Sequence, residues 1–200
     1  MSLRKSLALI VVAAGAAASP VVFAANAPAT STAPAAAASA DLPANADLSK
    51  IAGEPLLANA DIARGKKMFS TQGGNCLSCH GWDGDGTGKN PRSEGNAAML
   101  RESGLDAQGF IEIISCGIPG TPMPHHDPQA YKDDRCYGMT EADFEPNQEP
   151  HKGKSLKHED IVNLTAYIMT SIQGKPPATY EDCAAWFEAS AAKACAAFKK

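Results

Sequence analysis

One short run of residues limits what this chain can become. Residues 76–80 read Cys-Leu-Ser-Cys-His, so two thiols stand three positions apart and an imidazole follows directly. On a helix this spacing places the thiols about one turn from each other, within reach of the two vinyl groups of a porphyrin. We therefore predict that Cys76 and Cys79 attach one haem c covalently and that His80 binds its iron.

Two other kinds of site also use paired cysteines. A redox-active dithiol is expected between a strand and a helix in a βαβ unit, and a four-cysteine zinc site needs a second pair with matching spacing. The sequence predicts neither feature. Covalent haem is therefore the better interpretation of this motif.

The amino terminus has the features of an export signal. Arg4 and Lys5 precede an apolar stretch, residues 7–18, and residues 22–24 form a small-residue cleavage sequence. We expect residues 1–24 to be removed as a signal peptide; an uncleaved membrane anchor is the alternative, but the apolar stretch is short for one. The mature protein should then lie in the periplasm without stable membrane insertion, where thiols can oxidise.

The residues after the signal peptide are expected to form a linker, and the mature chain is acidic. Residues 25–50 are mostly Ala, Pro, Ser and Thr without hydrophobic periodicity. Removal of residues 1–24 leaves 16 basic and 22 acidic residues, a net charge of −6. This balance argues against nucleic acid as a partner, and suits association with a basic patch on another protein or simply keeps the chain soluble.

Four further cysteines lie outside the haem motif: Cys116, Cys136, Cys183 and Cys195. An even number in an oxidising compartment predicts two disulfides, although four cysteines allow three pairings. Chain proximity favours Cys116 with Cys136 and Cys183 with Cys195.

Hydrophobic periodicity predicts helices around the haem motif. The first, capped by Asn59 or Asp61, should run toward Gln72, and Gly65 on its apolar face predicts close approach of another helix. The second should begin after Asp106 and end near Cys116, with the buried residues Phe110, Ile113 and Ile114.

Two helices are expected near the carboxyl terminus. The longer covers residues 157–173, has Ser155 as its candidate cap, and buries Ile161, Leu164, Tyr167 and Ile168. A short one follows the capping box that Thr179 and Asp182 form.

The segment that follows His80 is too rich in glycine for a regular element. Within it, the carbonyl of Pro91 is our candidate acceptor for the second ring nitrogen of His80, which would fix the tautomer. Asp83 and Asp85 leave calcium binding open, although no acidic residue stands at the closing position of a calcium loop.

A proline-rich loop provides the candidate for the second iron ligand. Residues 117–124 contain three prolines and should form a rigid loop that presents Met123 between two of them. A thioether is a favoured ligand in high-potential electron carriers, so we predict that Met123 binds the iron opposite His80. His125 and His126 are the alternatives. Residues 132–154 are expected to be a long irregular excursion, which the Cys116–Cys136 pair would hold against the Met123 loop.

In this order of features, residues 60–173 resemble a class I cytochrome c. The resemblance implies an all-α fold in which the first and last helices cross, with Gly65 and Phe69 against Ala166 and Tyr167. It implies the same roles for His80, Met123 and Pro91, and a cytochrome domain over residues 51–174 with a disulfide-containing extension over residues 175–200. The excursion after Met123 and the additional cysteines depart from the family pattern.

The four additional cysteines resemble those of cytochromes linked to methanol metabolism. That resemblance implies a periplasmic quinoprotein (PQQ) alcohol dehydrogenase as electron donor, with another cytochrome or a terminal oxidase as acceptor. Two protein ligands leave iron no open position, so we expect an electron carrier rather than an enzyme. The alternatives are a haem enzyme or gas sensor with a labile sixth ligand, and a subunit permanently bound in a dehydrogenase or oxidase complex.

Overall fold

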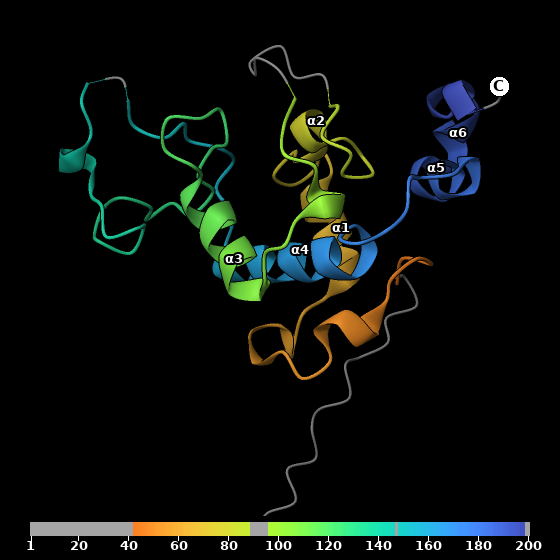
Figure 1. The fold of residues 1–200 in the computed structure, drawn as a ribbon, viewed down its shortest axis with the longest axis horizontal. Helices are drawn as coiled ribbons and strands as arrows, with labels where there is room; N and C mark the ends of the chain where they lie inside the picture. The colour runs from red at the N-terminus through yellow and green to blue at the C-terminus, as the bar shows by residue number, and fades with distance from the viewer. Residues whose placement is uncertain (1–41, 89–95, 147, 199–200) are drawn as a thin grey trace, which may run out of the picture. The chain divides into compact units, whose positions relative to one another are not determined.

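Helices account for all regular structure in residues 42–88, 96–146 and 148–198, which are the residues described in this computed structural model. No strand occurs among them; the only β contacts there are two isolated bridges. The expected all-α class is therefore confirmed (Figure 1). The α-helices are α1 (Ile62–Phe69), α2 (Leu77–His80), α3 (Ala107–Cys116), α4 (His158–Ser171), α5 (Tyr180–Phe187) and α6 (Ala191–Ala194). Short 3₁₀ helices are η1 (Leu48–Ile51), η2 (Pro55–Leu57), η3 (Leu100–Glu102), η4 (Glu141–Asp143), η5 (Glu188–Ser190) and η6 (Ala196–Phe198).

Helices α1 and α4 cross at close range (Figure 1). The contact is centred on Gly65, where an added Cβ would lie 2.0 Å from the Asn163 carbonyl oxygen and 2.7 Å from Tyr167 Cβ. Only glycine fits such a crossing, so the low helix propensity of Gly65 is offset by tertiary packing. Phe69 is fully buried one turn later, with its ring centroid 5.6 Å from that of Tyr167. The predicted helix crossing is thus confirmed.

The start of α1 is tied to α4 by polar contacts. Asp61 is the N-cap, and its carboxylate accepts from Arg64 N at 2.9 Å. The Asp61 N–H donates to Asn163 Oδ1 at 2.7 Å, and Arg64 Nε contacts Asp160 Oδ1 at 2.5 Å. These bonds satisfy amide groups that a helix start would otherwise leave without acceptors.

Two details of the helix predictions are wrong. Helix α4 starts at His158 with Lys157 as N-cap and no side-chain cap, so Ser155 does not cap it; acidic Glu159 and Asp160 in the first turn complement the helix dipole instead. In α3, Ile113 is half-buried, and the fully buried isoleucines are Ile111 and Ile114. The buried face of α3 therefore follows positions 107, 110, 111 and 114, which is the spacing of a 3.6-residue period.

The folded part includes residues that the sequence assigns to the linker. Asp47 N donates to the Thr170 carbonyl at 2.9 Å, and Asn45 Nδ2 donates to the Ser171 carbonyl at 3.1 Å. These contacts place residues just before Ile51 against the end of α4. The predicted signal peptide, residues 1–24, and the linker up to residue 41 lie outside the described residues. Among the described helices, none is long and apolar enough to cross a membrane.

The carboxyl-terminal extension is a disulfide-linked helical hairpin. Thr179 and Asp182 form the predicted capping box of α5, and Cys183 pairs with Cys195 as chain proximity predicts. Trp186 attaches this hairpin to the helical core. Its ring centroid lies 6.1 Å from that of Phe69 and 6.0 Å from that of Tyr167.

Candidate haem-binding site

The two cysteines that are predicted to attach the haem lie at α2. Cys76 directly precedes this helix, and Cys79 is its third residue. Cys76 is the N-cap residue, and the N–H groups of Cys79 and His80 donate to its carbonyl at 3.2 and 2.9 Å. Both thiols are half-buried, and neither belongs to the two disulfides. Burial raises the pKa of the Cys76 thiol to about 12. A redox-active dithiol needs the opposite shift.

His80 is oriented by a backbone carbonyl. Its Nδ1 contacts the Ala98 carbonyl oxygen at 2.8 Å, which makes Nδ1 the protonated nitrogen and leaves the lone pair of Nε2 for a metal. Burial lowers the pKa of His80, which favours the neutral ring that a ligand must have. Pro91, the predicted acceptor, lies outside the described residues. The described acceptor is Ala98.

The loop after His80 folds back on α2. Gly86 N donates to the His80 carbonyl at 2.8 Å, and Gly88 N donates to the Cys79 carbonyl at 3.0 Å. An added Cβ at Gly88 would lie 2.6 Å from three backbone atoms of residues 78–79, so glycine is needed for this approach. The carboxylate of Asp83 pairs with Arg101, and that of Asp85 accepts from Thr87 N at 2.9 Å. Both aspartates thus stabilise the loop itself.

The predicted Met123 loop, residues 117–124, is closed on itself. Ile118 N donates to the Met123 carbonyl at 3.2 Å, and Met123 N donates to Thr121 Oγ1 at 3.2 Å. Gly117 has a φ of 67°, and an added Cβ there would lie 2.7 Å from the Met123 carbonyl oxygen and from His125 N. The two ends of the loop therefore meet at Gly117. The side chain of Met123 is half-buried.

The two histidines after Met123 have different surroundings. His125 Nδ1 contacts the Asp127 carbonyl at 3.1 Å, and its ring packs edge-on against Tyr131 with centroids 5.9 Å apart. His126 is buried, and its Nδ1 contacts the Lys154 carbonyl at 2.7 Å. Burial lowers the pKa of His126. His125 thus packs with the residues that follow it, whereas His126 belongs to the interior.

His126 lies close to the cysteine pair, and two glycines leave room for its ring. An added Cβ at Gly74 would lie 3.2 Å from Cys76 Sγ and 3.4 Å from His126 Cε1, so the ring and the thiol both lie next to Gly74. Gly153 is closer to the ring, because its added Cβ would lie 2.7 Å from the same Cε1. The residue three positions after Met123 therefore lies beside the haem motif. Sequence reasoning missed the contact of these two glycines with His126, although Gly74 stands two residues before Cys76.

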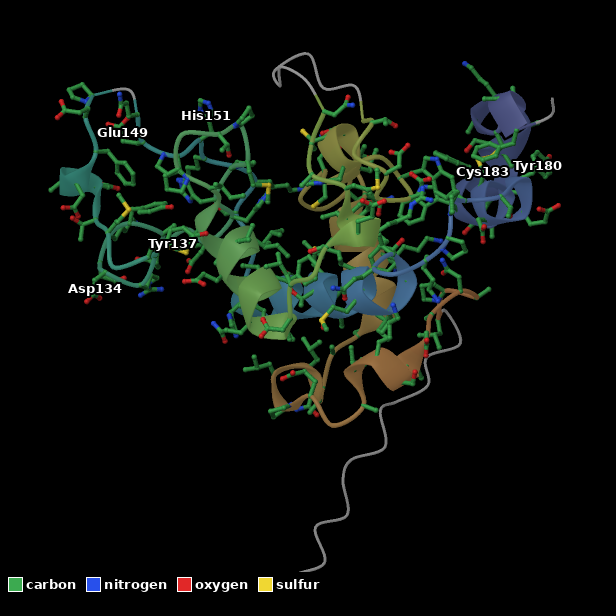
Figure 2. The ribbon with its side chains drawn as sticks, in the orientation of Figure 1. Asp134, Tyr137, Glu149, His151, Tyr180 and Cys183 are labelled. Carbon is green, nitrogen blue, oxygen red and sulfur yellow. A yellow bond between two sulfur atoms is a disulfide. The ribbon has the colours of Figure 1, made fainter. Side chains whose placement is uncertain are left out.

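The segment between the Met123 loop and residue 150 has its own small core. Cys116 pairs with Cys136, as predicted, with 5.4 Å between their Cα atoms. Ala130 and Tyr131 are buried around this disulfide, and Met139 and Phe144 pack against them. Figure 2 shows Asp134, Tyr137 and Glu149 in this segment, which follows α3 in the chain. We refer to residues 127–149 below as the 127–149 segment.

The residues of this site fit a covalently bound haem c. Two half-buried thiols lie about one helical turn apart, at the N-cap and in the third residue of α2, and the hydrogen bond at Nδ1 of the adjacent imidazole leaves Nε2 available. This is the donor set that attachment through two thioethers and one axial nitrogen requires. Among the described residues, no cluster of three or more His, Cys, Asp or Glu side chains forms a separate metal site.

Comparisons with known proteins agree with the site. The model of the cytochrome c family matches residues 62–171, from the first residue of α1 to the last residue of α4. No curated protein matches the chain. Among solved structures, a reducing HAO-like protein complex of Kuenenia stuttgartiensis is 20% identical, with a TM-score of 0.37, over 56% of this chain and 44% of that one. A similarity this weak carries no functional argument. On the family match, this chain belongs to the cytochrome c family, whose covalent haem c serves electron transfer.

Proposed function

We propose that this protein is a periplasmic one-electron carrier in which Cys76 and Cys79 attach the haem, and His80 and Met123 bind its iron from opposite faces. The observation that carries the proposal is the hydrogen bond from His80 Nδ1 to the Ala98 carbonyl, which leaves the lone pair of Nε2 available to the iron. When bound, the haem supplies an iron that cycles between the ferric and ferrous states. If His80 and Met123 both bind the iron, they would leave no position for a substrate.

The residues of the chain have separate tasks in this proposal. Ala98 holds the imidazole of His80 in one tautomer and orientation, so the ligand does not reorient when the iron changes charge. The closed loop around Met123 restricts the thioether, because Gly117 and the Ile118 N–H fix both ends of the loop. A site that changes little between its two oxidation states transfers electrons with little reorganisation.

We propose a quinoprotein alcohol dehydrogenase as the electron donor and another cytochrome or a terminal oxidase as the acceptor. The placement of the four additional cysteines supports this donor class, and the charge distribution supports a basic partner surface. The 127–149 segment has seven acidic and two basic residues, a net charge of −5. Since the mature chain has a net charge of −6, nearly all of its excess negative charge lies in this one segment.

Much of this charge is exposed. Asp134, Glu141, Glu145 and Glu149 are all exposed, and none of them forms an ion pair within the described part of the chain. The segment is joined by a disulfide to the residue that precedes the Met123 loop. An acidic surface so close to the loop would attract a basic patch and raise the association rate at low ionic strength.

Four measurements on protein purified from a periplasmic extract test the proposal. Mass spectrometry should find one haem on the peptide that contains Cys76 and Cys79. The ferrous protein should bind carbon monoxide slowly or not at all. In stopped-flow experiments, reduction of the ferric protein by a methanol-oxidising quinoprotein should be fast, and its rate should decrease as salt is added. Rapid carbon monoxide binding would instead indicate a haem enzyme or gas sensor, and co-elution with a dehydrogenase or oxidase in gel filtration would indicate a permanent subunit.

A further inference from the structure

The position of Met123 depends on the two residues at which its loop begins. Because Ile118 N bonds the Met123 carbonyl, and the backbone near Met123 and His125 packs directly on Gly117, a shift of residues 116–117 moves the whole loop. Whatever holds Cys116 and Gly117 in place therefore also holds the thioether.

The 127–149 segment is bonded to Cys116 and Gly117 through three interactions. The Tyr131 hydroxyl donates to the Cys116 carbonyl at 2.6 Å, and the Tyr137 hydroxyl donates to the Gly117 carbonyl at 2.7 Å. The third link is the disulfide between Cys116 and Cys136. Three residues within seven positions of chain, Tyr131, Cys136 and Tyr137, thus contact the last residue of α3 and the first residue of the loop.

Tyr131 is packed in place, whereas Tyr137 is 40% exposed. Tyr131 is 3% exposed, and its ring packs edge-on against Phe144 with centroids 5.1 Å apart. Both tyrosines have a positive φ, 62° for Tyr131 and 59° for Tyr137, and they are two of the four non-glycine residues with this conformation in the described chain. Non-glycine residues adopt it only where their surroundings over-determine it. Burial also raises the pKa of Tyr131 to about 12, so its phenol keeps the proton that it donates.

We infer that Tyr131 and Tyr137 are positioning residues for the second iron ligand: with the Cys116–Cys136 disulfide, they clamp the base of the Met123 loop and keep the thioether on the iron. This inference deepens the proposed function, because it assumes that Met123 is the ligand. It gives the long excursion after Met123 a task at the haem site besides its charge.

Hydroxyl deletions test the clamp in the haem-containing protein. Tyr131→Phe, Tyr137→Phe and the double variant keep the rings and remove only the donors, and Tyr180→Phe in α5 is the matched control. Two readouts are used. The first is the rate at which cyanide replaces the thioether in the ferric protein. The second is the pH midpoint at which the thioether leaves the ferric iron as the pH is raised. We expect each lost hydrogen bond to speed cyanide binding by up to about tenfold. The midpoint should fall in the double variant, with no change for Tyr180→Phe.

The disulfides provide a second, independent comparison. Cys116→Ser with Cys136→Ser should speed cyanide binding, whereas Cys183→Ser with Cys195→Ser should leave it unchanged, even if both pairs lower the urea midpoint of unfolding. Suppose that methionine binds the iron of the wild-type protein. Equal rates of cyanide binding in the wild-type protein and all variants would then overturn the inference and leave the proposed function intact. Faster binding in both disulfide variants, in proportion to lost stability, would also overturn it. A wild-type protein without methionine-bound iron would overturn both.

Discussion

The α1–α4 crossing and the Met123 loop are held in place in different ways. The crossing consists of two regular helices, of which α4 is buried along most of its length, and it closes where Gly65 lets two backbones touch. The loop has no regular element, and depends on two tyrosine hydroxyls, one disulfide and a glycine at positive φ. The comparison suggests that the crossing sets the stability of the fold, whereas the loop sets the properties of the iron.

Replacement of Met123 by Ala should have the largest effect on the haem. Loss of the thioether should lower the reduction potential by on the order of 0.2 V, within the range of about 0.8 V that axial ligands control. It should also open the iron to carbon monoxide, with little change in thermal stability of the helices. His126→Gln is the matched control, since His126 is an alternative ligand candidate and is buried beside the cysteine pair. If His126→Gln opens the iron and Met123→Ala does not, the ligands have been assigned in the wrong order.

Gly65→Ala should have the largest effect on stability. The added methyl would lie 2.0 Å from a backbone oxygen of α4, so the helices must separate. We expect a loss of about 3 kcal/mol in the free energy of unfolding, at the upper end of the cost of overpacking. Urea unfolding followed by circular dichroism measures it. Gly104→Ala serves as control, because nothing lies within 4 Å of an added Cβ there. Equal stability of the two variants would mean that the helices do not cross at Gly65.

A smaller loss of stability should follow from Trp186→Ala in the carboxyl-terminal hairpin. The half-buried indole contacts Phe69, Tyr167 and Trp82, and Lys66 Nζ lies 4.9 Å from its ring centroid. We expect about 2 kcal/mol, below the cost of deleting a fully buried tryptophan. Phe198→Ala should cost less, since Phe198 is 38% exposed. A stability change no larger for Trp186→Ala than for Phe198→Ala would show that the hairpin adds nothing to the core.

The smallest effect is expected from removal of acidic side chains in the 127–149 segment, which should change the rate of association with the electron donor. We expect a triple variant to be reduced severalfold more slowly than the wild-type protein by a basic donor at low salt; its changes are Glu141→Gln, Glu145→Gln and Glu149→Gln. The difference between the two rates should vanish at high salt because charges are then screened. The control changes Glu102, Glu159 and Glu188, which are exposed glutamates outside the segment. Stopped-flow rates at two ionic strengths measure both. The same rate loss in the control would mean that overall charge, not the 127–149 segment, attracts the donor.

The helical part of the fold was largely predictable from the sequence because its signals are local. Asp61, Asp106 and Thr179 cap the helices that their side chains predict, and the apolar stripe of α4 is buried as expected. The error in α3 concerns Ile111 and Ile113, which are both apolar; Ile111 shares the helical face of Ala107, Phe110 and Ile114, whereas Ile113 does not. Lys157 carries no capping signal, so the start of α4 was less well defined.

The haem site was predictable only where side chains identify it. The cysteine pair and His80 form a recognisable motif, but the acceptor for His80 is a backbone carbonyl, which every residue has, so Ala98 gave no signal. Likewise, Tyr131 and Tyr137 bond to carbonyls 15 and 20 positions away, and no local pattern specifies such a pairing. The neighbouring cysteines were the only local sign that this part of the chain returns to the Met123 loop.

The most direct test of the central claim is a proton magnetic resonance spectrum of the ferrous protein. A methionine bound to haem iron lies in the ring current of the porphyrin, so its methyl signal is shifted far upfield of other methyl signals. The account predicts one such signal in the wild-type protein and its loss in Met123→Ala. A spectrum without a shifted methionine methyl, or one in which the signal survives in Met123→Ala, would contradict it.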